Sequence, residues 1–199
     1  MNDVLIAARA HALVIFAGAG VSMTAPTSLP GWKPLNAAIF AALRKRLADG
    51  LGLDGVLSDE ETLLTSARDA DRYPPDYQAQ VLEEMCGERY FHGLQSLDVD
   101  ITNLDHRAIA ALAAAGAVRA IITTNFDRLL ELALHSAGVQ CETAIDTAGY
   151  ERLREGVRSG GVAALPVVKI HGSVSDPRSM IDTLKQRRRG RSKALEECL

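Results

Sequence analysis

The sequence predicts an α/β fold in which a mostly parallel, doubly wound sheet carries helices on both faces. Short apolar runs of strand length alternate with stretches that repeat apolar residues at helical spacing, and three of these runs end directly in glycine or small polar residues. The chain has 199 residues, of which 47% are hydrophobic, so it can bury the core of one such domain.

The first half of the chain predicts one strand followed by helices. The run Leu13–Ala17 is continuously apolar and ends in glycines, which is typical of a buried strand that enters a tight turn. The apolar residues from Leu35 to Leu47 recur at helical spacing. Further helical pieces, broken near Gly87, predict a helical insertion over about residues 50–100, after the first strand and helix.

The second half alternates more regularly. The β-branched run Val118–Thr124 lies between a helical stretch over residues 105–116 and another that begins near Arg128. Pro166–Ile170 is a clear strand, and Val139–Thr143 is a weaker candidate. Because an open nucleotide-binding sheet usually has about five or six strands, we expect a single Rossmann-like domain over residues 1–199 that is truncated at its C-terminal end.

Composition excludes several classes of protein. A net charge of −3 gives no reason to expect nucleic acid as a partner. The cysteines Cys86, Cys141 and Cys198 are odd in number and form no CxxC pair, which favours reduced thiols over disulfides or a zinc cluster. The N-terminus lacks the features of a signal peptide, and no apolar stretch approaches the roughly 18 residues of a membrane span, so we expect a cytoplasmic protein without a membrane partner.

The first motif follows the first strand. Gly18, Ala19 and Gly20 permit a tight turn, and Ser22 follows them at the start of a helix, an arrangement suited to binding a phosphate. The dinucleotide fingerprint GxGxxG requires glycine or alanine where this chain has Met23. The alternative is a glycine-rich turn that binds no ligand.

The second motif follows the strand Val118–Ile122. Thr123, Thr124, Asn125 and Asp127 provide small polar or acidic side chains at a strand's carboxyl end, where open α/β sheets bind ligands. The alternative is that Asn125 or Asp127 merely caps the helix that follows.

The third motif is His171-Gly172-Ser173, directly after another apolar strand. A histidine there is a candidate general base, and the alternative is a structural histidine satisfied by hydrogen bonds. Because all three motifs follow strands, one crevice at the same end of the sheet is expected to collect them.

Three other features allow a functional and a structural interpretation. Trp32 can wall a ligand pocket or simply pack. Asp105 is expected to cap a helix, and neighbouring His106 receives no catalytic role. The basic run over residues 185–191 is typical of a solvated helix face, and a contact with a polyanion is the alternative.

At these motifs the sequence resembles the sirtuin family. In that family the first strand leads into Gly-Ala-Gly, a branched residue and Ser, a middle strand into Thr-Gln-Asn-Ile-Asp, and a later strand into His-Gly. The same features stand here, in the same order, at Gly18–Ser22, Thr123–Asp127 and His171-Gly172.

The departures narrow this resemblance. Sirtuin deacylases carry Gly-Ile-Pro-Asp-Phe-Arg where this chain reads Ser28–Lys33, and Thr124 replaces their glutamine. Their four-cysteine zinc module is missing, because only Cys198 follows His171. The chain looks more like the bacterial sirtuin-like domains that hydrolyse NAD, often as effectors in antiviral defence.

This resemblance implies an NAD⁺ hydrolase that cleaves the nicotinamide–ribose bond to give nicotinamide and ADP-ribose. NAD is then the substrate and no metal is required. The alternatives are an NAD-dependent protein deacylase or ADP-ribosyltransferase, and a module that senses NAD or ADP-ribose without turnover. We expect either that the chain forms a homo-oligomer or that it works with a fused or associated sensor domain.

The resemblance also implies roles for the motif residues. Asn125 orients the ribose and the attacking water, Asp127 lies near the nicotinamide, and His171 acts as base. The remaining positions are expected to bind the dinucleotide: Gly18, Ala19, Gly20 and Ser22 at the pyrophosphate, with Trp32, Thr123, Thr124, Gly172 and Ser173 elsewhere in the pocket.

Overall fold

The computed structural model describes residues 2–51, 73–159, 164–188, 190 and 192–198. The chain divides into two compact units. The first, here called the sheet unit, comprises Met1–Leu29, Phe91–Ile181 and Gly190–Leu199, and the second, the helical unit, comprises Pro30–Tyr90 and Asp182–Arg189. A single domain with a truncated end stays a prediction.

A four-stranded sheet organises the sheet unit. Its strands are β1 (Leu13–Ala17), β2 (Val118–Thr123), β3 (Cys141–Ala144) and β4 (Leu165–Lys169), in the order β1-β2-β4-β3. Every neighbouring pair is parallel, which confirms the predicted α/β sheet and all four predicted strands.

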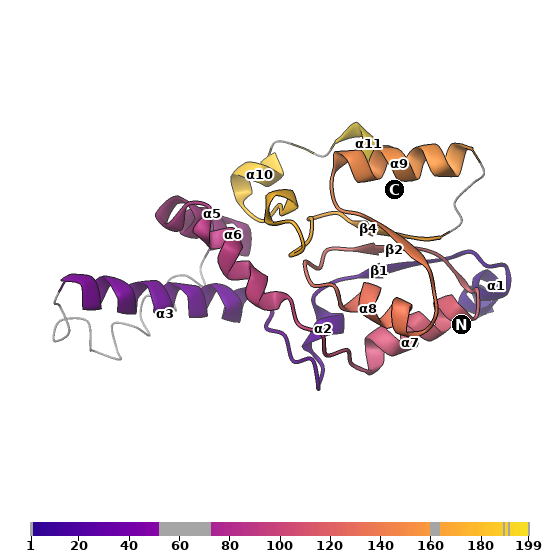
Figure 1. Ribbon diagram of the computed structural model, residues 1–199, viewed down its shortest axis with the longest axis horizontal. Coiled ribbons are helices and arrows are strands. Elements are labelled where there is room, and N and C mark those ends of the chain that lie inside the picture. The colour runs from indigo at the N-terminus through magenta and orange to yellow at the C-terminus, as the bar shows by residue number, and fades with distance from the viewer. Residues whose placement is uncertain (1, 52–72, 160–163, 189, 191, 199) are drawn as a thin grey trace. The chain divides into compact units, whose positions relative to one another are not determined.

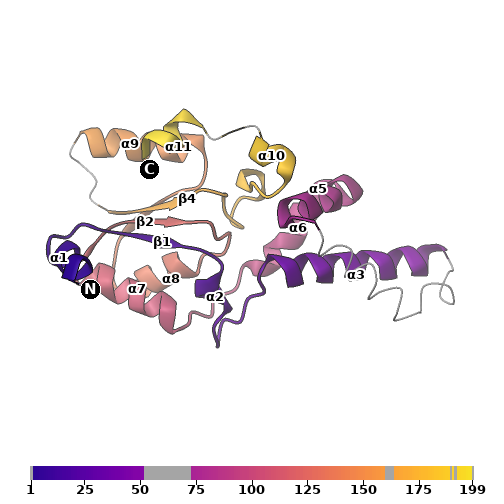
Figure 2. The same cartoon turned by 180° about the vertical axis from the view of Figure 1, so that it is seen from behind.

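Helices cover both faces of this sheet (Figures 1 and 2). On one face lie α7 (Leu104–Ala114) and α8 (Leu129–Ser136), and on the other lie α9 (Thr147–Arg158) and α11 (Lys193–Cys198). The doubly wound arrangement predicted from the sequence is therefore confirmed. The shorter elements of this unit are α1 (Asn2–Arg9), α2 (Gly20–Met23), η1 (Gln95–Leu97) and η2 (Pro177–Ser179).

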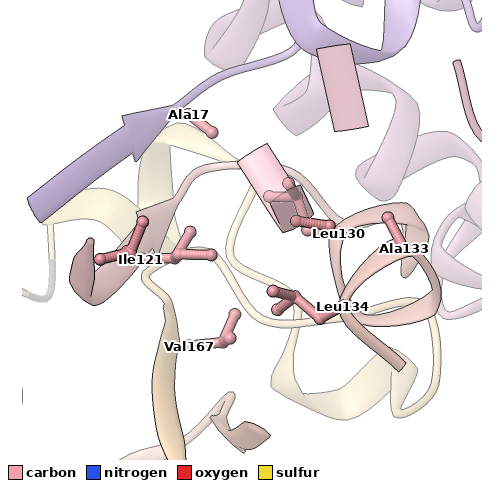
Figure 3. Close-up of a cluster of buried hydrophobic side chains, with 8 residues drawn as sticks. Ala17, Ile121, Leu130, Ala133, Leu134 and Val167 are labelled. Atoms are coloured by element: carbon pink, nitrogen blue, oxygen red, sulfur yellow. The ribbon is translucent and has the colours of Figure 1, made fainter. Parts of the chain in front are cut away.

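The core beneath the sheet joins neighbouring strands to α8. Ile121 and Val167 are paired across β2 and β4, and both side chains are fully buried. They point toward Leu130 and Leu134 on α8, as Figure 3 shows. Burying a side chain of this size stabilises the fold by about 1.5–3 kcal/mol, so this cluster secures the strand ends that carry the second and third motifs.

Strand β1 departs from the buried strand that was predicted. Its alternate side chains Val14 and Phe16 are 54% and 66% exposed, whereas Ala17 is buried against α8's cluster. The reason is position: β1 is an edge strand, and the hydrophobic cluster built by α9 and α11 centres on β3 and β4. A continuous apolar run cannot reveal that only one of its faces is covered.

The helical unit contains α3 (Trp32–Leu51), α5 (Pro75–Cys86) and α10 (Leu184–Arg188), and α6 (Arg89–Leu94) crosses its boundary. The predicted helix after the first strand and the predicted helical pieces are confirmed, including the break at Gly87, whose φ is 59°. The part of the predicted insertion over residues 52–72 lies outside the described residues. No described helix combines the length and apolar character needed to cross a lipid bilayer.

Candidate active site

The three motifs begin side by side because the strands that carry them are in register. Ala17 pairs with Thr123, and Thr123 pairs with Lys169, so β1, β2 and β4 end at one level of the sheet. Thr124 N–H then donates to the Ala17 carbonyl at 3.1 Å, and Ile170 N–H donates to the Thr123 carbonyl at 3.0 Å. Carboxyl ends of neighbouring parallel strands are where open α/β sheets bind ligands.

Ser22 joins the first motif to the second. Its side chain is 2% exposed, and its hydroxyl donates to Asp127 Oδ2 at 2.9 Å. Asn125 Nδ2 donates to the same hydroxyl oxygen at 3.1 Å. These three predicted site residues, far apart in the sequence, form one buried hydrogen-bonded cluster.

Asn125 leaves one strong acceptor unused. Its side-chain nitrogen donates to Ser22 and, at 3.1 Å, to Asp127 Oδ2, while its backbone N–H donates to Thr123 Oγ1 at 3.0 Å. Its Oδ1 is buried and has no hydrogen-bond partner among the described residues. A buried amide oxygen without a donor costs about 1–3 kcal/mol, so this atom is suited to receive a hydrogen bond from a ligand or water.

Asp127 combines the two interpretations that the sequence left open. Its Oδ1 accepts from Leu129 N–H at 3.1 Å at the start of α8, so it does cap that helix. Its Oδ2 accepts from Ser22 and Asn125 and belongs to the polar cluster. Among the described residues the Asn125 side chain makes no such capping contact, and it belongs to the polar cluster instead.

The glycine turn of the first motif is close to the second motif on one side and open on the other. A side chain at Gly18 would meet Thr124 Oγ1 at 3.4 Å, an ordinary contact distance. At Gly20 a side chain would meet no described atom within 4 Å. The turn therefore packs against the strand end while its exposed side leaves room for a ligand. Ala19, between the two glycines in the sequence, is half-buried.

The third motif forms a tight turn beside the second. His171 is half-buried, and its ring lies 6.5 Å, centroid to centroid, from that of Phe126. Gly172 has a φ of 83°, and a Cβ there would lie 2.2 Å from the Ser179 carbonyl oxygen, so the turn requires glycine. Ser173 is buried, and its hydroxyl donates to the Phe126 carbonyl at 3.4 Å. Ligand contacts of Gly172 and Ser173 stay predictions.

Trp32 is the first residue of α3 in the helical unit and is half-buried. Its role in a ligand pocket also stays a prediction.

A residue given no role from the sequence, His106, belongs to the polar cluster. It is fully buried in the first turn of α7, and its Nε2 lies 3.2 Å from Ser22 Oγ. The helix cap is Asn103, whose side chain accepts from His106 N–H at 3.1 Å, so the prediction of Asp105 as cap is wrong. The cap lies two residues earlier than predicted, which places Asp105 in the first turn of the helix, where it accepts from Thr24 Oγ1 at 2.8 Å.

Lys169, the last residue of β4, holds the backbone of the second motif through hydrogen bonds. Its side chain is fully buried, and its ammonium group donates to the carbonyls of Phe126, at 3.3 Å, and Asp127. It also pairs with Glu131 Oε1 at 3.0 Å. A buried cation requires such compensation, and here two of the compensating groups are the backbone of the loop that carries Asn125 and Asp127. A lysine within an apolar strand was the available signal.

In the described part of the chain, no group of three or more His, Cys, Asp or Glu side chains is arranged to hold a metal ion. Cys141 is half-buried, and burial raises the pKa of its thiol, so it is unsuited to act as a nucleophile.

Comparison with known proteins supports the class that the fold defines, a Rossmann-like α/β domain with polar residues at the carboxyl ends of its parallel strands. Residues 119–195 match the family model of the SIR2-like domain. The match extends from β2 into α11 and includes the second and third motifs, but it covers less than half of the 199 residues and excludes Gly18–Ser22 and His106. The match supports the resemblance to the sirtuin family. A search of curated proteins found no match to the chain.

Proposed function

We propose that this protein is an NAD⁺ hydrolase that cleaves the bond between nicotinamide and ribose. The observation that carries the proposal is the buried Asn125 amide oxygen without a described partner. It lies where the first and second motifs meet, within the region that matches the SIR2-like domain. That oxygen is suited to accept a hydrogen bond from a ribose hydroxyl or from the attacking water.

The reaction needs few chemical groups. As the bond from the ribose C1′ to nicotinamide breaks, nicotinamide takes the bonding electron pair and leaves neutral, and positive charge develops on the ribose. Water adds to C1′ and gives its proton to His171, the proposed base, so that NAD⁺ and water yield nicotinamide, ADP-ribose and a proton. The Asp127 carboxylate stabilises the developing charge, which explains its placement beside Asn125.

The glycine turn supports the proposal that the pyrophosphate of the dinucleotide binds here. The turn at Gly18, Ala19 and Gly20 is open on the side of Gly20, so a pyrophosphate can approach its backbone. Ser22 connects this turn to the proposed catalytic amide. We further propose, from the resemblance to bacterial sirtuin-like effectors, that the activity depletes cytoplasmic NAD in antiviral defence.

The test is a product assay on NAD⁺ alone with purified protein. Asn125→Ala and His171→Ala are each expected to lower kcat by about 10²–10⁴-fold, the range typical of a lost catalytic group. His135→Ala, at the exposed end of α8, is the matched histidine control and should retain the parental rate. Parental rates in both site variants would refute the assignment.

The same assay separates hydrolysis from its alternatives. Chromatography should show nicotinamide and ADP-ribose in equal amounts when no protein or peptide acceptor is present. Product formation only after an acetylated peptide is added would indicate group transfer. Saturable binding in calorimetry with intact NAD⁺ recovered afterwards would indicate a sensing module.

A further inference from the structure

The buried imidazole of His106 contacts the polar cluster, although no step of the proposed reaction uses it. It lies on α7, contacts Ser22 of α2, and is separated from Asn125 and Asp127 only by that serine. A fully buried polar side chain must have its hydrogen bonds satisfied in definite directions.

The backbone determines which imidazole nitrogen carries the proton. Asn103 N–H lies 3.2 Å from His106 Nδ1, and because a backbone N–H can only donate, Nδ1 must be the acceptor. In a neutral imidazole the proton then resides on Nε2. His106 Nε2 therefore donates to Ser22 Oγ, 3.2 Å away.

The direction of this bond determines the next two. Ser22 Oγ accepts from His106 and also from Asn125 Nδ2, which occupies both of its lone pairs. Its single proton is left to point at Asp127 Oδ2. Asn125 Nδ2 spends its two N–H groups on Ser22 and Asp127, and turning the amide around would place its oxygen against the carboxylate.

We propose that His106 is a positioning residue that, by donating through Ser22, fixes the amide orientation of Asn125 and leaves its oxygen for the substrate. Its link to catalysis rests on the proposed function, whereas the bond directions themselves do not. The residues come from three separate segments, so the orientation depends on the helix α7 as well as on the two motifs.

The environment keeps this imidazole neutral. Burial lowers the pKa of His106, and the carboxylates that face it, Asp127 across Ser22 and Asp105 on its own helix, only oppose this in part. Protonation would place a second N–H against the Asn103 N–H and break the capping box of α7. The donor to Ser22 therefore persists as the neutral Nε2–H tautomer.

Nitrogen NMR of the full chain tests the bond directions without any enzyme assay. At pH 7 the His106 Nε2 should show the shift of a protonated nitrogen and Nδ1 that of an unprotonated one, and both shifts should persist as the pH falls below 6.5. Protonation of Nδ1 at pH 7, whether as the other tautomer or as imidazolium, would overturn the proposal. Failure of NAD⁺ cleavage would leave this result unaffected.

Two variants test the positioning role. His106→Leu removes the donor and should lower kcat about tenfold, the effect of one lost hydrogen bond in the transition state, with little change in KM. His106→Gln restores an N–H donor and should recover most of that loss. An equal loss of kcat in both variants, each still folded by circular dichroism, would assign His106 a merely structural role. If both variants unfold, the NMR measurement on the parent protein decides whether His106 donates to Ser22.

Discussion

The sheet unit and the helical unit each bury an ionisable side chain, and burial shifts the two pKa values in opposite directions. His106 in the sheet unit has its pKa lowered, chiefly by desolvation. Asp182 in the helical unit, 2% exposed, has its pKa raised to about 6, again chiefly by desolvation. In both units the protein interior favours the neutral form.

This difference predicts opposite responses to acid. The unfolded chain protonates His106 more readily than the folded sheet unit does, so the stability that this residue contributes is present above about pH 6.5 and is lost as the pH falls below it. The folded helical unit holds a proton on Asp182 more tightly than the unfolded chain, so its contribution is greatest at low pH and is lost as the pH rises through about 6. Burial, rather than the sign of the charge, is the shared cause.

The largest expected effect is a loss of stability in the sheet unit. Gly172→Ala forces a methyl group to within 2.2 Å of the Ser179 carbonyl oxygen at a φ of 83°, so we expect a loss of more than about 3 kcal/mol in the free energy of unfolding. Gly138→Ala is the matched control, because its φ is 74° but no described atom lies within 4 Å, and it should cost only about 1 kcal/mol. Hydrogen exchange in β4 measures both.

Exchange in α5 during the same experiment sharpens the comparison. If α5 amides keep their protection while β4 loses its own, the two units can be treated separately. If the α5 and β4 amides lose protection together, the two units unfold together, and their pH responses cannot be measured separately. Equal effects of the two alanine variants would contradict the steric argument for Gly172.

A smaller effect is expected in the helical unit. Asp182→Asn mimics the protonated acid and retains an acceptor for the hydroxyl of Tyr90, which donates to Asp182. It should remove an acid-dependent gain of up to about 3 kcal/mol in the free energy of unfolding, which the parent shows as the pH falls from 7 to 4.

Fluorescence of Trp32, the one tryptophan in the chain, reports on this unit during denaturant unfolding. Glu88→Gln, at an exposed position of the same unit, is the charge-matched control and should leave the pH dependence intact. An unchanged pH dependence in Asp182→Asn would show that another group causes it.

The smallest effect is expected for an ion pair that is not buried. Arg128 contacts Asp98 through two bonds of 2.7 and 3.0 Å, but the side chains are 44% and 32% exposed. Asp98→Asn should change the free energy of unfolding by less than about 1 kcal/mol at neutral pH, measured by urea denaturation. A change as large as that of Asp182→Asn would mean that charge pairing, rather than burial, dominates these responses.

Much of the fold was predictable because its signals are local. The strand at Pro166–Ile170 and the polar residues after Ile122 are visible as short patterns, and parallel strands bring such carboxyl ends to one edge. Helix α9 was missed although Tyr150, Leu153 and Val157 recur at helical spacing, because its other residues are mostly polar and only a narrow apolar stripe remains. Its cap, the Asp146 side chain that accepts from Gly149 N–H at 2.8 Å, was a second local cue.

The candidate site was only partly predictable. Motif residues such as Asn125 and Asp127 could be selected because small polar side chains at strand ends are recognisable in a sequence. His106 could not, because its importance comes from a contact with Ser22, which is 84 positions away in the chain. Lys169 stands out as a lysine within an apolar strand, but its role could not be predicted, since two of its partners are backbone carbonyls that no side-chain pattern encodes.

By itself, the sequence determined where strands end and which polar groups follow them, because strand length, glycine turns and apolar periodicity are local properties. Only the tertiary structure decided which way those groups face and which atoms they leave unpaired. The direction of a hydrogen bond depends on every donor and acceptor around it, and at Asn125 these come from segments that meet only after folding.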